Sequence, residues 1–157
     1  MRLSTKGRYA VMAVVDLAKR GEGGPMSLAE IAGRQEISLS YLEQLFARLR
    51  KSGIVKSVRG PGGGYALAYS ADEMRISDII IAVDEPIKAT RCKADSPSGC
   101  MQNNARCITH DLWSELTNQI HLYLSSVTVM DVCERRVLGT SGVFHQENAR
   151  AKHFQAD

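Results

Sequence analysis

Three of the chain's four cysteines and one of its four histidines lie within the twenty residues RCKADSPSGCMQNNARCITH, residues 91–110. These candidate ligands have the spacing Cys-x7-Cys-x6-Cys-x2-His and are Cys92, Cys100, Cys107 and His110. Unliganded reduced cysteines prefer apolar cores, whereas these stand among lysine, aspartate, serine, asparagine and arginine. Thiolate and imidazole are the donors of zinc sites and of iron–sulfur clusters. The stretch therefore predicts a bound metal ion or cluster.

Two kinds of centre suit this ligand set. Three thiolates and one imidazole make a closed structural zinc site, although such sites usually hold their cysteines two to four residues apart. Here only Cys107 and His110 are that close. Wide separations suit an iron–sulfur cluster, in which a histidine ligand raises the reduction potential and binds as the neutral imidazole. A second interpretation makes His110 only the first residue of a helix.

The composition is typical of one globular domain. The chain has 157 residues, of which 44% are hydrophobic and 24% charged, enough to bury a modest core without disulfides. Asp16, Lys19 and Arg20 interrupt the apolar run near the N-terminus, so the segment is unlike a signal peptide, and no apolar run is long enough to span a bilayer. We expect a cytoplasmic protein without a membrane partner. In that compartment thiols stay reduced, and clustered cysteines indicate metal instead of disulfides.

The domain that carries the ligand loop begins with helices. Apolar residues at three- and four-residue steps predict an amphipathic helix over 5–20, which GEGGP ends. A short helix over 28–35 follows, and Ser27 and Glu30 have capping-box spacing at its start. The next helix runs through LSYLEQLFARLRKSG, and glycine ends it. Its predicted buried residues are Leu39, Leu42, Leu45, Phe46 and Leu49.

Two short β-type runs come next, IVKSV and YALAY, joined by RGPGGG. Glycines and a proline at this density form an exposed hairpin tip. A helix-turn-helix over about 28–52, followed by a basic hairpin over 54–69, is the winged-helix arrangement. In it the second helix enters the major groove of DNA, and the wing reaches the minor groove or nearby phosphates. The alternatives are a simple hairpin or a nucleotide-binding loop, but no Lys-Ser/Thr pair follows and the glycines lead into a strand.

The net charge of +3 conceals a basic segment. No acid occurs from Gln44 to Ala71, and five cations fall within the twelve residues from Arg48 to Arg59. This pattern alone is also typical of a solvated face, but after a helix-turn-helix it indicates a DNA surface. The predicted DNA contacts are Ser38, Ser40, Tyr41, Glu43, Gln44, Arg48, Arg50, Lys51, Lys56, Arg59, Gly60, Pro61, Gly62 and Gly63.

Side-chain chemistry divides this set. Gln44 can pair with adenine, and Glu43 can accept a hydrogen bond from the cytosine amino group. Other interpretations are that Glu43 repels phosphates at wrong sites, or is an ordinary solvated residue. The serines and Tyr41 suit phosphates or base edges, and the cations from Arg50 to Arg59 suit phosphates.

The second half of the chain is predicted to be helical around the ligand loop. Ser77 is expected to cap a short helix, DIIIAVDE, that ends at Pro86. ITHDLWSELTNQIHLYLSSV predicts a long helix whose apolar stripe contains Leu112, Trp113, Leu116, Ile120, Tyr123, Leu124 and Val127. Such a stripe needs a partner, which is the same helix of a second subunit or, alternatively, the chain's own domain. Thr128 is expected to cap a last helix, VMDVCERR, in which Cys133 is interpreted as a small core residue.

We therefore predict a mainly α protein with a small β wing. The winged helix-turn-helix domain covers 1–85, and the ligand loop covers 86–110. The long dimerisation helix and the short C-terminal helix occupy 111–136, and a flexible tail covers 137–157.

Five stretches, MRLSTKGRYAV, ISLSYLEQLFARLRKSGIVKSVRGPGGGY, VDE, TRC and CITHDLW, resemble the IscR family of winged-helix regulators of iron–sulfur cluster assembly. The resemblance runs from Met1 to about Glu134. It implies a homodimeric transcription regulator with a [2Fe–2S] cluster on Cys92, Cys100, Cys107 and His110. It also implies DNA contacts from the second helix and the wing. Cluster-assembly genes, including the regulator's own operon, would be repressed or activated according to cluster occupancy.

Three other functions are compatible with parts of the sequence. Relatives with similar DNA-binding halves sense iron or nitric oxide through [4Fe–4S] clusters, and His110 separates this chain from them. A structural zinc interaction module would be colourless. A small zinc hydrolase would lack a recognisable catalytic motif and leave the DNA-binding half unexplained. We therefore expect neither an enzyme nor a small-molecule substrate.

Overall fold

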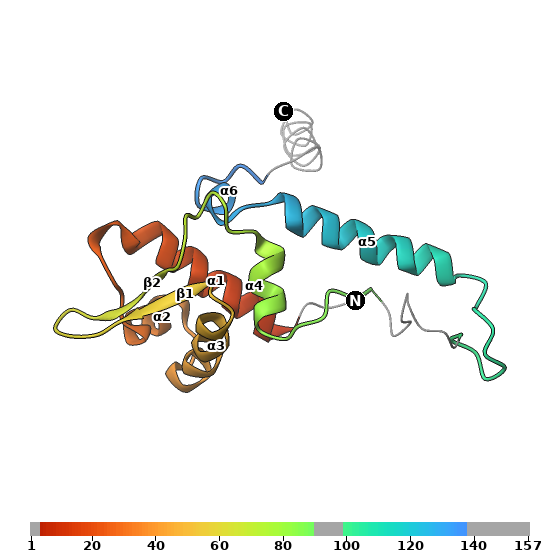
Figure 1. Cartoon of the computed structure of the whole chain (residues 1–157), viewed down its shortest axis with the longest axis horizontal. Coiled ribbons are helices and arrows are strands. Elements are labelled where there is room, and N and C mark those ends of the chain that lie inside the picture. The colour runs from red at the N-terminus through yellow and green to blue at the C-terminus, as the bar shows by residue number, and fades with distance from the viewer. Residues whose placement is uncertain (1–3, 90–98, 138–157) are drawn as a thin grey trace, which may run out of the picture.

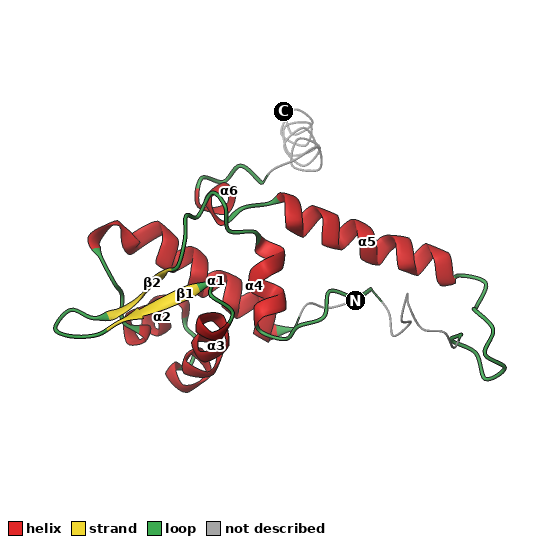
Figure 2. Cartoon of the chain, viewed as in Figure 1, coloured by secondary structure: helices red, strands yellow, loops and turns green. Residues whose placement is uncertain are grey.

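The computed structural model describes residues 4–89 and 99–137 (Figure 1). Cys92 and residues 138–157 of the predicted tail lie outside the described residues. Helices dominate, with one small antiparallel sheet (Figure 2). The elements are α1 (Thr5–Arg20), η1 (Gly21–Gly23), α2 (Leu28–Gln35), α3 (Leu39–Lys51), β1 (Val55–Val58), β2 (Gly64–Leu67), α4 (Ile76–Ala82), α5 (His110–Ser126) and α6 (Val129–Cys133). The predicted fold class, mainly α with a small β wing, is confirmed.

Local sequence signals determine the helix-turn-helix formed by α2 and α3. Ser27 Oγ accepts a hydrogen bond from the Glu30 amide, and the Glu30 carboxylate accepts one from the Ser27 amide, so the predicted capping box is present. Glu36 ends α2 in the left-handed conformation, with φ 54°. Ser38 then caps α3. Leu39 was predicted to be buried with the other apolar residues of α3, but it is 42% exposed. It is the first residue of the helix and lies beyond the core that covers Leu42, Leu45, Phe46 and Leu49.

The wing is joined by its backbone to the start of α2. β1 pairs with β2 from Val55 opposite Leu67 to Val58 opposite Gly64. Tyr65 exchanges two backbone hydrogen bonds with Met26, of 2.8 and 2.9 Å. A Cβ at Gly64 would lie 2.3 Å from the Met26 carbonyl oxygen, so only glycine permits this close approach. The Tyr65 ring packs edge-to-face on Phe46 of α3, with centroids 5.0 Å apart. The base of the wing and the helix-turn-helix therefore form one packed unit.

The core gathers around α1, which contacts α2, α3, α4, α6 and β2. Its largest fully buried side chains are Phe46, Leu17, Ile31, Leu42, Leu45, Leu49, Met74, Ile79, Ile80, Val14, Val55 and Val83. Asp16 is a buried carboxylate beside them. Asp16 accepts hydrogen bonds from Arg34 Nη2 at 2.7 Å and Gln35 Nε2 at 3.1 Å, which ties α1 to α2. The partners satisfy a charge that would be costly to bury alone.

The start of α4 differs from the prediction. Arg75, not Ser77, occupies the N-cap position, and no side chain caps the helix. Arg75 forms a backbone bridge with Thr128, and the Ile76 amide donates to the Val127 carbonyl at 3.0 Å. This pairing fixes the extended backbone before Ile76, so the helix begins one residue ahead of the serine. Ser77 is buried in the first turn. Thr128 does cap α6, as predicted, in a capping box with Asp131.

Helix α5 projects away from the core (Figure 1). His110 is its only buried residue. Large apolar side chains along it are exposed, among them Leu112 at 61% and Tyr123 at 56%. Among the described residues, no helix is long and apolar enough to cross a membrane.

Glu85 holds the start of α1. Its carboxylate accepts hydrogen bonds from the Ser4 amide and the Gly7 amide, both at 2.8 Å, and from the Ser4 hydroxyl. A Cβ at Gly7 would lie only 3.1 Å from Glu85 Oε2, so glycine makes room for the carboxylate. Partial burial raises the pKa of Glu85, but the hydrogen bonds from Ser4 and Gly7 and the Lys6 charge outweigh it, leaving the pKa below the usual value.

We expect Glu85 to make stability depend on pH. Because its folded pKa is lowered, its contribution is complete above the pKa of the unfolded chain and is lost as pH falls through the folded pKa. Glu85→Gln should therefore lower the free energy of unfolding near neutral pH, by about 1 kcal/mol given solvent screening, and flatten its fall in acid.

Urea unfolding at several pH values measures this effect. The control is Glu73→Gln, since the Glu73 carboxylate forms no hydrogen bond among the described residues. Equal pH profiles for wild type and Glu85→Gln would contradict the role of Glu85.

Candidate metal centre and nucleic-acid interface

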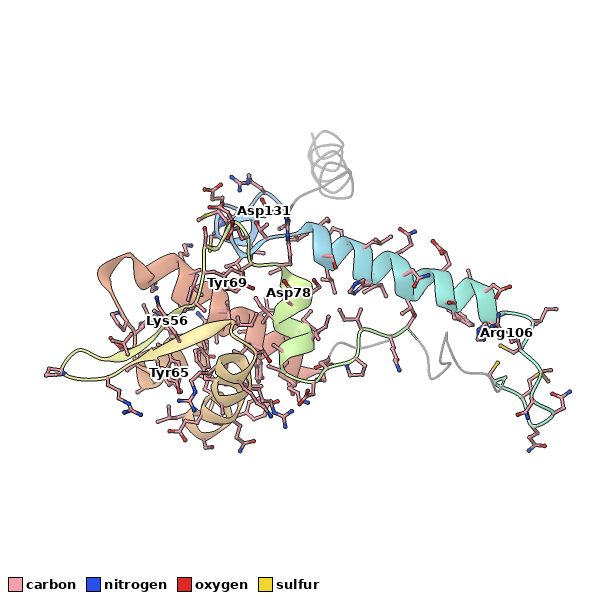
Figure 3. All side chains as sticks on the ribbon, viewed as in Figure 1. Lys56, Tyr65, Tyr69, Asp78, Arg106 and Asp131 are labelled. Carbon is pink, nitrogen blue, oxygen red and sulfur yellow. The ribbon has the colours of Figure 1, made fainter. Side chains whose placement is uncertain are left out.

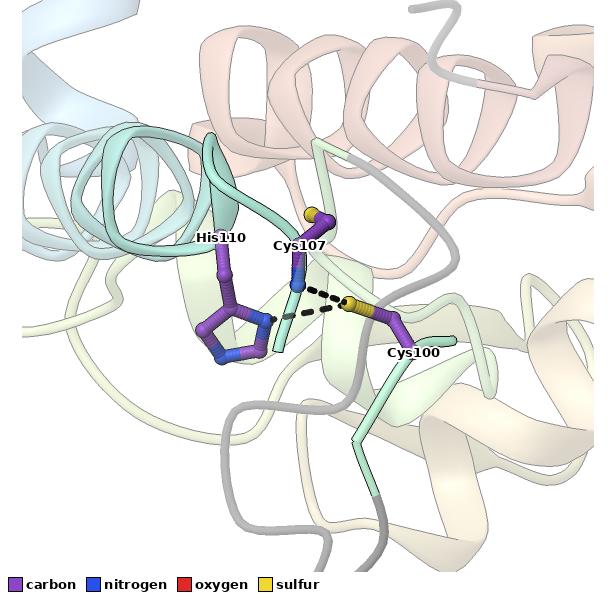
Figure 4. Close-up of side chains that lie close together, drawn as sticks. All are labelled: Cys100, Cys107 and His110. Carbon is purple, nitrogen blue, oxygen red and sulfur yellow. Dashed lines mark hydrogen bonds between the residues drawn. The ribbon is translucent and has the colours of Figure 1, made fainter. Parts of the chain in front are cut away.

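Three of the four predicted metal ligands converge. The Sγ atoms of Cys100 and Cys107 and a ring nitrogen of His110 all lie within 4.8 Å of one another. The Cys107 amide donates to Cys100 Sγ at 3.0 Å, and Cys100 Sγ lies 3.7 Å from His110 Nδ1 (Figure 4). Two thiols and an imidazole at this spacing can bind a metal ion or iron of a cluster. The predicted fourth ligand, Cys92, lies outside the described residues.

A tight loop brings the two cysteines together. The Gly99 amide donates to the Asn104 carbonyl, and the Met101 amide donates to the Ala105 carbonyl, both at 3.1 Å. A Cβ at Gly99 would lie 2.2 Å from the Ala105 carbonyl oxygen, so glycine permits the loop to close. The His110 amide then donates to the Cys107 carbonyl at 3.0 Å, which places the imidazole at the first residue of α5.

Thr109 lies between the candidate ligand Cys107 and the indole of Trp113. Trp113 Nε1 donates to Thr109 Oγ1 at 3.1 Å, and the same oxygen lies 3.8 Å from Cys107 Sγ. Because Thr109 Oγ1 accepts the indole hydrogen, its own hydrogen is available to the sulfur. A hydrogen bond to a ligating sulfur changes its electron density, and hence the reduction potential of a bound cluster.

The predicted DNA contacts lie on α3, at its N-cap and on the wing, whose side chains Figure 3 draws as sticks. On and around α3, the side chains of Ser38, Ser40, Glu43, Gln44, Arg48, Arg50 and Lys51 are exposed. On the wing, the exposed residues are Lys56, Arg59, Gly60, Pro61 and Gly62. Gly63 and Tyr41 are half-buried, and the Tyr41 ring packs edge-to-face against Tyr9 with centroids 6.1 Å apart. Most of the predicted set is therefore available to a large ligand.

The candidate metal centre and the candidate DNA surface leave both a transcription regulator and a small zinc hydrolase open, and comparison with known proteins decides between them. The family model of Rrf2, described as iron-dependent transcriptional regulator, matches residues 3–135. The chain belongs to the Rrf2 family. It is therefore a transcription regulator of winged-helix fold and not an enzyme, and the zinc-hydrolase alternative is set aside.

Relatives of this Rrf2 chain include curated regulators and solved structures. The HTH-type transcriptional regulator IscR of Photorhabdus laumondii is 49% identical over 157 residues, covering 99% of this chain and 94% of that protein. IscR of Escherichia coli O9:H4 is 48% identical, with the same coverage. The structure of T. potens IscR gives a TM-score of 0.69 at 38% identity, covering 87% of this chain and 88% of that one. CymR, the global cysteine regulator of B. subtilis, gives 0.71 at 34% identity, covering 86% and 98%.

Two predicted DNA contacts of the Rrf2 chain have distinctive surroundings. Lys56 faces the other side of the wing from Tyr65, since neighbouring residues of a strand point to opposite faces. There it lines a cavity of about 300 Å³ with Leu17, Ala18 and Gly21. Arg48 forms an ion pair with Asp84.

The sequence prediction missed several neighbours of these sites. Thr109 and Trp113 could have been found, because residues four apart on a helix face each other. Asp84 could not, since it is 36 residues from Arg48. Cys133 lies apart from the candidate ligands, with its Sγ 3.8 Å from the Val15 carbonyl oxygen, and burial raises the pKa of its thiol. Both observations fit the interpretation of Cys133 as a core residue.

Proposed function

We propose that this Rrf2 regulator senses iron–sulfur cluster supply through a [2Fe–2S] cluster. Cys92, Cys100, Cys107 and His110 would hold it, and the cluster would supply a redox-active, oxygen-labile group whose presence alters the protein. The convergence of Cys100, Cys107 and His110 within 4.8 Å is the observation that carries the proposal. The imidazole favours [2Fe–2S] over an all-thiolate [4Fe–4S] centre, and the wide spacing of the cysteines favours a cluster over structural zinc.

The proposed output is transcription. With and without its cluster, the regulator would prefer different promoters, so that genes of cluster assembly, including its own operon, are repressed or activated with demand. It would act in the cytoplasm, where promoter DNA is available and thiols stay reduced.

The ligand assignment is tested by anaerobic purification of wild type and His110→Cys. Wild type should absorb in the visible range and contain iron and sulfide, whereas His110→Cys should keep a cluster with a lower midpoint potential. The reason is that a second thiolate on the same iron donates more charge than an imidazole. Cys133→Ser is the control and should keep the wild-type potential. A colourless protein with zinc, or equal potentials for wild type and His110→Cys, would contradict the assignment.

The DNA surface on α3 and the wing supports binding to double-stranded promoter DNA. Seven predicted contacts at α3 and five on the wing are exposed, and this part of the chain contains many cations and no acid from Gln44 to Ala71. In a winged helix, Gln44 and Glu43 would read bases in the major groove, and Arg59 would meet phosphates near the minor groove.

Arg59→Ala should weaken binding to specific and scrambled duplexes alike. Loss of one phosphate contact should flatten the slope of log affinity against log salt by roughly one unit. The matched control is Arg136→Ala, because Arg136 pairs with Asp131 near α6, away from α3 in Figure 1. Fluorescence anisotropy over a salt series measures both. An unchanged slope for Arg59→Ala would remove Arg59 from the interface.

A homodimer formed through α5 is the third part of the proposal. The exposed apolar side chains of α5 include Leu112, Trp113 and Tyr123, and a soluble monomer rarely exposes a large apolar patch of this kind. A second α5 would cover them and would place two DNA surfaces on one particle, as two half-sites require.

Tyr123→Asp should shift the protein towards monomer. A carboxylate buried without a partner should weaken dimerisation by ~2 kcal/mol or more. The control is Asn118→Asp, which adds the same charge at an exposed position on another face of α5. Sedimentation velocity over a range of concentrations checks the result. A monomeric wild type, or equal weakening by both variants, would contradict the α5 dimer.

A further inference from the structure

Arg48 is an exposed arginine on the proposed DNA surface, and a carboxylate already pairs with it. Arg48 Nη1 bonds to Asp84 Oδ2, and the two side chains remain 46% and 75% exposed. Asp84 lies in the turn after α4, whereas Arg48 lies on α3 beside Gln44 and Lys51 in the sequence segment that has no acid of its own. The fold therefore supplies, from a different element, the negative charge that this segment lacks.

The backbone holds Asp84 in position although its side chain is exposed. The Asp84 amide donates to the Ile81 carbonyl at 2.9 Å, and Lys6 Nζ donates to the Asp84 carbonyl at 3.3 Å. Asp84 has a φ of 56°, a left-handed conformation that aspartate tolerates better than most residues. The next residue, Glu85, is bound to the start of α1 through Ser4 and Gly7. These contacts make the position of the Asp84 carboxylate a property of the fold.

We propose that Asp84 competes with the DNA backbone for Arg48 and thereby lowers the affinity of the regulator for DNA. An exposed ion pair contributes only about 0–1 kcal/mol, so it opens at little cost. A phosphate that replaces the carboxylate releases a condensed counterion from the duplex, which adds a salt-dependent gain. While Asp84 is present, part of the free energy gained from the Arg48–phosphate contact is spent on breaking the Arg48–Asp84 ion pair. A further part is cancelled by the repulsion between the Asp84 carboxylate and the phosphates. The inference rests on the proposed DNA surface and names a residue that tunes it.

The competition differs from a simple change of net charge because it requires Arg48. Removing the Asp84 charge should free the guanidinium for a phosphate, whereas in the absence of Arg48 the same substitution has nothing to free. The effects of the two residues on DNA binding should therefore be strongly non-additive.

The test is a double-mutant cycle made of wild type, Asp84→Asn, Arg48→Ala and the double variant. The probes are a duplex recovered by wild type from a randomised pool, and a scrambled duplex, each titrated over a salt series. Asp84→Asn should bind both roughly 3- to 10-fold more tightly and steepen the salt slope by about one unit. Arg48→Ala should weaken binding to both duplexes, and adding Asp84→Asn to it should tighten binding much less than Asp84→Asn does in wild type. All four proteins are compared in one cluster state, and thermal unfolding verifies that each is folded.

Asp78→Asn is the matched control, because Asp78 is exposed on α4 and forms no ion pair among the described residues. Equal tightening by Asp78→Asn would reduce the effect to net charge and overturn the proposal. Unchanged binding by Asp84→Asn would also overturn it, and weaker binding would mean that Asp84 orients Arg48 on the DNA. If Arg59→Ala still weakens binding in those cases, the proposed DNA surface stands and only the inference about Asp84 fails.

Discussion

The backbone pairing of residues 74–76 with residues 127–129 joins the segment before α4 to the segment between α5 and α6. The Val129 amide donates to the Met74 carbonyl at 2.9 Å, and the Ile76 amide donates to the Val127 carbonyl at 3.0 Å. This pairing sets the first residue of α4, and it directs α6 onto α1, where Val129 is fully buried. It also anchors the C-terminal end of α5, so the helix projects from a rigid base. His110 begins the same helix about 25 Å away, at 1.5 Å per residue.

This arrangement separates the candidate metal centre from the core. The candidate ligands Cys100, Cys107 and His110 lie at the distal end of α5, and the loop that holds the cysteines is organised by its own hydrogen bonds. The folding of the helix-turn-helix and the wing depends on side chains from α1 to α4, and these do not involve the ligands. Gain or loss of a bound group can therefore change the outer end of α5 while the DNA surface stays folded.

Features determined by neighbouring residues could be predicted from the sequence. The capping boxes at Ser27 and Thr128 each need a partner three residues away, and the glycines of the wing tip permit only a turn. The stripe of α3 was predicted except at Leu39, where helical spacing alone cannot tell how far the core extends. Long-range pairings could not be predicted. The start of α4 depends on Thr128, and the contacts of Glu85 with Gly7 and of Asp84 with Arg48 join segments that no local pattern connects.

The contact between Gly64 and the Met26 carbonyl affects how the regulator can adapt to operators of different half-site spacing. Because the wing backbone is hydrogen-bonded to the residue preceding the Ser27 cap, the hairpin and the helix-turn-helix are one body. One chain therefore presents the two elements of its proposed DNA surface, α3 and the wing, at a fixed mutual angle. In the proposed homodimer, operators whose half-sites differ in separation must be accommodated by relative rotation of the two subunits or by bending of the duplex. Tolerance to operator spacing should then be a property of α5 and of DNA stiffness, and the helix-turn-helix should contribute none of it.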